Sequence, residues 1–167
     1  MRVSSIEISR ALQDLWPHLT VGFDNPHHIW IPRHRYWAPS RKNFEEMIGM
    51  EWNVIAKHIE YTNDIWMCSN MAAAVAVVAD LYVLHLQSIQ AFKPEAKLEW
   101  AVAEVWGTKF RGQPMTHSVS LVMLEDKKLY FFEPQPHRDS DGNVVTPIKF
   151  DAWKADTEKD MIHFYKL

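Results

Sequence analysis

One long apolar segment, residues 65–92, constrains the fold of this chain more than any other feature. It reads IWMCSNMAAAVAVVADLYVLHLQSIQAF, and alanine and valine fall on nearly every face of a helix. Its apolar centre, residues 71–86, is interrupted by Asp80 and His85 and is shorter than the roughly 20 residues of a membrane span. We therefore expect a helix that is packed on most sides within a folded domain, and no association with a membrane.

The only cysteine of the chain, Cys68, stands at the start of this helix, where Ser69 or Asn70 is expected to cap the first turn. A lone cysteine cannot form an internal disulfide and is usual in a reducing compartment. The first 16 residues mix acidic and apolar side chains and lack the continuous apolar core of a signal peptide. Both observations predict a cytoplasmic location, which would be the host cytoplasm if the chain is encoded by a phage.

Periodicity predicts helices in the first part of the chain and strands in the second. A first helix ends at Pro17, and a second follows Ser40 with Phe44, Met47, Ile48 and Trp52 facing inward. The strand candidates are residues 98–106, 117–124 and 129–133, with a short edge strand at 144–150. This order predicts an α+β fold, in which N-terminal helices and a central, Cys68-bearing helix pack on a small antiparallel sheet.

Length and composition favour one domain over residues 1–167. Hydrophobic residues make up 47% of the 167 residues, and the chain contains no linker, repeat or low-complexity run. The net charge is −3, with both signs mixed along the chain. Nucleic acid is therefore not an expected partner.

Residues 22–39 combine three prolines with large aromatic and basic side chains and are expected to form an ordered loop. Two interpretations of this loop remain open. Its aromatic side chains can anchor it to the core, or they can form a binding surface together with the arginines. The residues of that candidate surface are Trp30, Arg33, Arg35, Tyr36 and Trp37. The loop histidines lack the spacing of a zinc set, so no metal site is predicted.

The segment MTHSVSLVMLEDKKLYFFEPQPH, residues 115–137, reads as a β-hairpin with polar residues at its open end. A three-residue turn at 125–127 places Leu124 opposite Lys128. His117 then lies opposite Gln135, and Glu133 lies one diagonal step from His117 on the same face. The imidazole and the carboxylate are therefore expected to meet, although strands also end in polar residues for no chemical reason.

A histidine held by a carboxylate has a fixed tautomer, and its imidazolium form is stabilised. Such a pair requires a nucleophile, and Cys68 is the only thiol of the chain. A helix N-terminus beside an imidazolium favours its thiolate form. A cysteine on a helix, a histidine on a strand and an acid on the next strand make a papain-like arrangement. The alternative is a cysteine that serves only as apolar packing.

The order Cys68, His117 and then FFEPQ resembles the papain-like cysteine-peptidase domain of the Marasmius oreades agglutinin family of fungal chimerolectins and its phage-encoded relatives. RYWAPSRKNFEEMI is similar as well, so the resemblance covers residues 24–136. It implies that Cys68 is the nucleophile, that His117 is the general base, that Glu133 orients His117, and that Trp66 lines the site. Gln135 and Asn70 are further candidates for orienting or lining the site.

The chain departs from that family next to the nucleophile. The family has an acidic pair after the cysteine, which takes part in calcium binding in the fungal members, and this chain has Ser69 and Asn70. We therefore expect neither calcium nor another cofactor. The first hypothesis is a cysteine peptidase or related hydrolase acting on a peptide or protein. The second is an inactive peptidase-like fold that works as a phage accessory module and binds a host protein through residues 30–37.

Overall fold

The computed structural model of the protein describes residues 1–21, 28–31, 35–58, 68–89, 99–136, 140–141 and 152–166. The helices are α1 (Ser5–Leu15), α2 (Arg41–Met47), the π-helix η1 (Ile48–Trp52), α3 (Asn53–Ala56) and α4 (Cys68–Ser88). The strands are β1 (Arg2–Ser4), β2 (Thr20–Val21), β3 (His28–Trp30), β4 (Arg35–Trp37), β5 (Val102–Phe110), β6 (Gln113–Met123), β7 (Leu129–Phe132), β8 (Ala152–Lys154) and β9 (Met161–Lys166). The predicted α+β class is confirmed.

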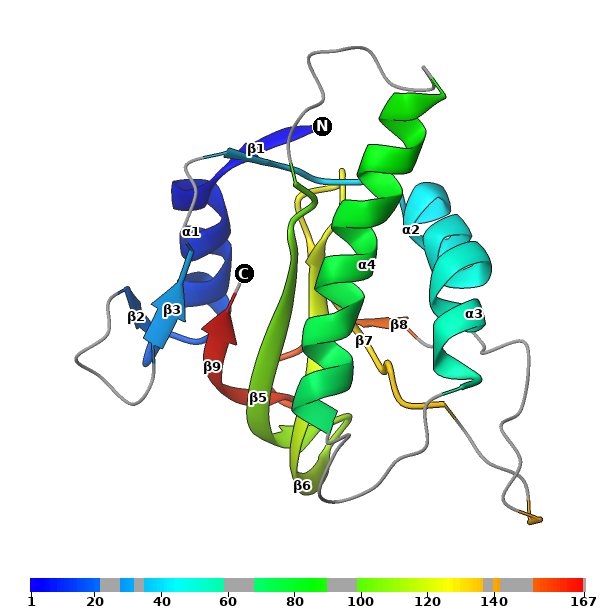
Figure 1. Ribbon diagram of the computed structural model, residues 1–167. Coiled ribbons are helices and arrows are strands. Elements are labelled where there is room, and N and C mark those ends of the chain that lie inside the picture. Colours follow the sequence, from blue (N-terminus) through cyan, green and yellow to red (C-terminus); the bar gives the residue numbers. More distant parts are fainter. Residues whose placement is uncertain are drawn as a thin grey trace.

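The main sheet has the strand order β2-β3-β9-β5-β6-β7-β8, and β1 pairs with β4 in a separate two-stranded sheet. The neighbouring strands β9, β5, β6, β7 and β8 pair antiparallel. Strand β3 is parallel to both of its neighbours, β2 and β9. The C-terminal strand β9 thus lies inside the sheet, between β3 and β5. In Figure 1 helix α4 runs along β5 and β6, with α2 and α3 beside it, while α1 lies near β3 and β9.

Two clusters of buried side chains cover the two faces of β5, β6 and β7. Residues at odd positions, such as Val119, Leu121 and Phe131, pack with Leu12 and Trp16 of the α1 region. Residues at even positions, such as Val102, Val122 and Phe132, pack with α4, α2 and η1. Because strand side chains alternate, one sheet separates the two cores.

The predicted cap of the second helix, Ser40, is confirmed, and the first helix has a cap that was not predicted, Ser4. The Ser4 side chain accepts a hydrogen bond from the Glu7 N–H, and the Glu7 carboxylate accepts one from the Ser4 N–H, which is a capping box. The Ser40 side chain accepts from the Asn43 N–H at 3.1 Å. Phe44, Met47, Ile48 and Trp52 are all buried, as predicted for the second helix.

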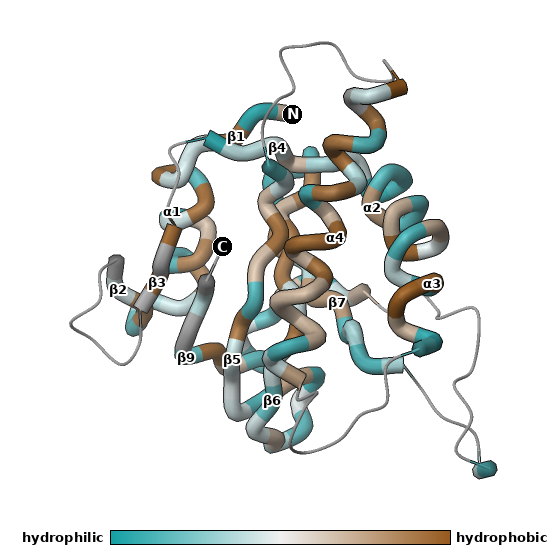
Figure 2. Tube along the Cα trace, in the orientation of Figure 1, coloured by the Kyte–Doolittle hydropathy of each residue, from teal (hydrophilic) through white to brown (hydrophobic). Residues whose placement is uncertain are grey.

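Helix α4 differs from the expected helix in two respects. It begins at Cys68, so Ser69 and Asn70 lie within its first turn and do not cap it. It also leaves an apolar row in solvent, since Val77, Leu81 and Leu84 each expose 57–59% of their surface. The expectation of a helix packed on most sides was therefore wrong, because one layer of sheet covers only one side of it. Figure 2 shows the apolar character along α4.

Within the described residues, one segment is long and apolar enough to cross a membrane, Cys68–Leu86 of α4. Length and composition alone give this result, and 39% of the segment is buried against the rest of the protein. The buried side of the helix packs on β5 and β6.

The hairpin register was predicted correctly, and several other strands were not. Leu121 pairs with Phe131, and Met123 with Leu129, as the turn at residues 125–127 requires. Strand β5 continues to Phe110 and turns at Arg111 and Gly112, both with positive φ, whereas the predicted strand ended at residue 106. Strands β8 and β9 were not predicted, and residues 22–39, which were expected to form a loop, contain β3 and β4. The predicted edge strand at 144–150 lies outside the described residues.

Candidate active site

The three residues predicted to act together converge at one end of the sheet. Cys68 is the first residue of α4, His117 lies on β6, and Glu133 directly follows β7. Nε2 of His117 lies 2.7 Å from Oε2 of Glu133, and the two side chains are 13% and 21% exposed. The site is thus shielded from solvent on most sides but can be reached from outside.

Strand β6 is longer than its partner β7, and this leaves room for Cys68 to contact His117. The last pair between β6 and β7 is Ser120 with Phe132, so β6 runs on past the pairing toward His117. The expected pair of His117 with Gln135 is therefore not part of the ladder. The thiol of Cys68 approaches β6 at this point, where it contacts the side chain of His117 and accepts a hydrogen bond from the N–H of Ser118. The Ser120 hydroxyl, donating to the Ala72 carbonyl at 3.3 Å, fixes α4 against β6.

Two hydrogen bonds fix Glu133, one to its side chain and one to the backbone of the next residue. The N–H of Gln135 donates to Oε1 of Glu133 at 2.9 Å, which leaves Oε2 to face the imidazole. The buried indole N–H of Trp52 donates to the Pro134 carbonyl at 3.1 Å. Trp52 was expected only as a core residue of its helix. Its position in the sequence gives no signal for this contact, which spans 82 residues.

The electrostatics of the site favour an ion pair. The hydrogen bond with Cys68, and after it that with Glu133, raises the pKa of His117 to about 10 against the opposing effect of burial. The hydrogen bond with His117 lowers the pKa of the Cys68 thiol, again against burial, and the N–H groups of Ser118 and Ser69 act in the same direction. Both shifts favour a thiolate beside an imidazolium.

Two further residues position His117, and sequence reasoning missed both. The ring of Phe110 stands edge-on to the imidazole, with centroids 6.2 Å apart and planes at 85°. Gly107 is the partner of His117 in the ladder with β6. A Cβ at Gly107 would overlap the Met161 carbonyl oxygen and the Phe110 ring, so only glycine fits here. Gly107 directly follows the predicted strand 98–106, so the signal, a glycine inside a strand that marks a close approach of backbones, was hidden by the predicted end of that strand at residue 106.

The remaining site candidates contribute less directly. Asn70 is exposed on the first turn of α4, where its side-chain oxygen accepts a long hydrogen bond, 3.4 Å, from the Ser69 hydroxyl. Gln135 takes part through its backbone N–H. Trp66 lies outside the described residues. No group of three or more His, Cys, Asp or Glu within the described ranges is arranged to hold a metal ion.

The described residues of the alternative binding surface, Arg35, Tyr36 and Trp37, do not share one face. Tyr36 is 1% exposed and belongs to the core on the α1 side, so it was wrong to place it on a surface. Side chains alternate along β4, so its neighbours lie on the opposite face from Tyr36. Arg35 is exposed there and Trp37 is half-buried. The side chain of Trp30 and the whole of Arg33 lie outside the described part of the chain.

Comparisons with known proteins show a fold and no family. No family model matches the chain, and no curated protein matches it. One similar solved structure is the Polyporus squamosus lectin bound to a human-type influenza-binding epitope, with a TM-score of 0.59 and 14% identity. The match covers 98% of this chain and 49% of that lectin chain. The protein therefore has the same fold as part of a fungal lectin chain and spans about half of its length.

Proposed function

We propose that this protein is a papain-like cysteine hydrolase that cleaves peptide or protein substrates. The observation that carries the proposal is the continuous contact of Cys68 with His117 and of His117 with Glu133, together with a lowered cysteine pKa and a raised histidine pKa. A thiolate paired with an imidazolium is the reactive form of this class of enzyme.

The proposed reaction has two steps. The Cys68 thiolate attacks the acyl carbon, and the His117 imidazolium gives its proton to the leaving amine, so that a thioester on Cys68 remains. Water then attacks the thioester, His117 takes the proton, and the acid leaves with the thiolate restored. Because Nε2 faces Glu133, Nδ1 is the ring nitrogen left for the proton transfer. The N–H of Cys68, in the first turn of α4, suits the developing oxyanion.

The fold shared with part of a fungal lectin chain is compatible with the resemblance to the Marasmius oreades agglutinin family of fungal chimerolectins. The motif match lies in Cys68, His117 and the sequence EPQ at residues 133–135. Ser69 and Asn70 replace the acidic pair of that family. Hard cations prefer carboxylates to such ligands, so the proposed enzyme works without calcium.

The first test is the pH dependence of Cys68 alkylation by iodoacetamide, in the wild type and in His117→Ala. We expect the wild-type thiol to titrate well below the roughly 8.5 of a free cysteine. Loss of the imidazolium in His117→Ala should move the titration upward and slow alkylation at pH 6 about tenfold or more, since each pKa unit is a tenfold change in thiolate. His85→Ala, an exposed histidine near the other end of α4, is the matched control.

The second test is hydrolysis of a mixed library of unstructured peptides, with Cys68→Ser as the inactive reference. Turnover that is lost in Cys68→Ser supports a hydrolase. An ordinary thiol that is unaffected by His117, with no turnover of the library, would refute it. The protein would then be better explained as a peptidase-like module that binds a host protein.

A further inference from the structure

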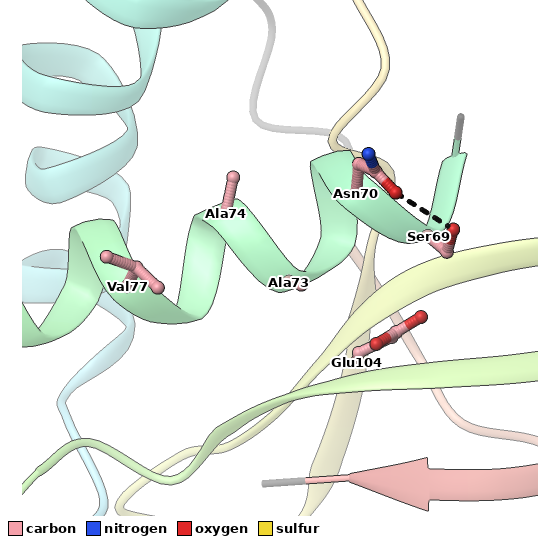
Figure 3. Close-up of a pocket in the computed structure, with 6 residues that line it drawn as sticks. All are labelled: Ser69, Asn70, Ala73, Ala74, Val77 and Glu104. Atoms are coloured by element: carbon pink, nitrogen blue, oxygen red, sulfur yellow. Dashed lines mark hydrogen bonds between the residues drawn. The ribbon is translucent and has the colours of Figure 1, made fainter. Parts of the chain in front are cut away.

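A pocket of about 460 Å³ opens beside the candidate nucleophile, between α4 and β5. Its walls are Ser69, Asn70, Ala73, Ala74, Val77 and Glu104. Figure 3 shows the first five along α4, with the Glu104 side chain rising from β5 below the start of the helix. The pocket is open to solvent where Asn70 and Val77 are exposed, and its volume is large enough for one substrate side chain.

The pocket has two chemically distinct regions. Ala73, Ala74 and Val77 give an apolar wall along the helix, whereas Ser69, Asn70 and the Glu104 carboxylate make the other part polar. Glu104 is half-buried, so its carboxylate is less screened than one on an open surface. A guest with an apolar stem and a cationic head matches both regions.

Glu104 on β5 lies close enough to Cys68 for one long substrate side chain to span the two. In the sheet Glu104 is the partner of Ser120, whose hydroxyl bonds the Ala72 carbonyl. Ala72 lies four helical steps after Cys68, a rise of about 6 Å. The four-carbon stem of a lysine, or the longer arm of an arginine, covers such a distance. A residue whose backbone is held at Cys68 can therefore place its charge at Glu104.

We propose that this pocket selects substrates with a lysine or arginine next to the cleaved bond, and that Glu104 is the residue that determines this specificity. The inference rests on the proposed hydrolase function. Glu104 also interacts within the protein, and a carboxylate can accept several hydrogen bonds at once, so an internal contact and a bound cation are compatible. Charge-assisted bonds to a shielded carboxylate are the stronger kind.

The test uses peptidyl acyloxymethyl ketones, which label active-site cysteines. One series carries arginine or lysine next to the reactive carbonyl, and the matched series carries citrulline or norleucine, which keep the shape without the charge. Each labelling rate is divided by the iodoacetamide rate of the same variant, which corrects for changes in the thiol itself. We expect the wild type to prefer the charged probes about tenfold or more.

Two variants decide the role of Glu104. In Glu104→Gln the preference should fall to within about twofold, and in Glu104→Lys it should turn toward a glutamate probe. Glu125→Gln, in the β6–β7 turn at the other end of the strands, should keep the wild-type preference. Labelling of Cys68 without preference for charge, or a preference that survives Glu104→Gln, overturns the inference and leaves the hydrolase proposal standing. Failure of every probe to label Cys68 overturns both.

Discussion

At the scale of single residues, the imidazole of His117 connects the two other groups of the site. One ring nitrogen faces Glu133 at 2.7 Å, and the ring also contacts the thiol of Cys68. Both contacts favour the protonated ring, and the pKa of His117 rises to about 10. A carboxylate at this place, where papain has an amide, thus widens the pH range in which the ring is charged.

Glu133→Gln tests that residue-scale argument. The amide keeps the shape but removes the charge, so the pKa of His117 should fall from about 10 by about one unit or more, while the contact with Cys68 keeps it above that of a free histidine. NMR titration of the ring nitrogens of His117 measures the shift directly. An unchanged titration would mean that Glu133 positions the ring without affecting its charge.

The same substitution should affect stability in a pH-dependent way. Because the folded-state pKa of His117 is raised, its stabilising effect is fully present below about pH 6.5 and fades as pH rises toward about 10. The free energy of unfolding lost in Glu133→Gln should therefore be larger at pH 6 than at pH 10. Denaturant titrations at the two pH values measure both losses, and equal losses would contradict the charge argument.

At the scale of elements, the close packing of β5, β6 and β9 places His117. Gly107 lies where β5 meets His117 on one side and Ile162 on the other. A Cβ at Gly107 would overlap the backbone of Met161, which cannot move without shifting β9. The strand that carries the candidate base is therefore positioned by a residue without a side chain.

Gly107→Ala should lower the free energy of unfolding by about 1–3 kcal/mol, the usual cost of overpacking. It should also slow Cys68 alkylation at pH 6, because Phe110 and the ladder at His117 must shift. Gly49→Ala is the matched control, since a Cβ there meets nothing within 4 Å and the residue is helical. Alanine at Gly49 should be neutral or stabilising by up to about 1 kcal/mol. Equal effects of the two variants would contradict the packing argument.

The hairpin contact of the site was predictable from the sequence, and several contacts between distant elements were not. The meeting of His117 with Glu133 was predictable, because a hairpin register follows from its own turn and needs no distant information. The pairing of β9 with β5 and the contact of Trp52 with Pro134 were not, because they join segments far apart along the chain. The exposed side of α4 was predicted as buried, since an apolar pattern does not show how many layers cover a helix.

At the scale of the whole molecule, the fully buried Asp160 joins segments that are distant in the sequence. Its side chain accepts hydrogen bonds from the N–H of Arg111 at 2.9 Å, the N–H of Asp156 at 2.9 Å and the indole N–H of Trp153 at 3.2 Å. Its carbonyl accepts from the indole of Trp16 at 3.1 Å. One residue thus ties the β5–β6 turn, the segment between β8 and β9, and the end of α1 to the start of β9.

Asp160→Asn should therefore destabilise the whole fold although it changes one atom. Both carboxylate oxygens accept bonds from backbone N–H groups, so in either orientation the new amide group points its own hydrogens at one of these donors. The loss of bonds to a charged acceptor, with at least one donor left unsatisfied, should lower the free energy of unfolding by about 2–4 kcal/mol. Chemical denaturation measures this loss, with the exposed Glu158→Gln as the control. A loss no larger than that of the control would mean that Asp160 merely occupies the junction and does not hold these segments together.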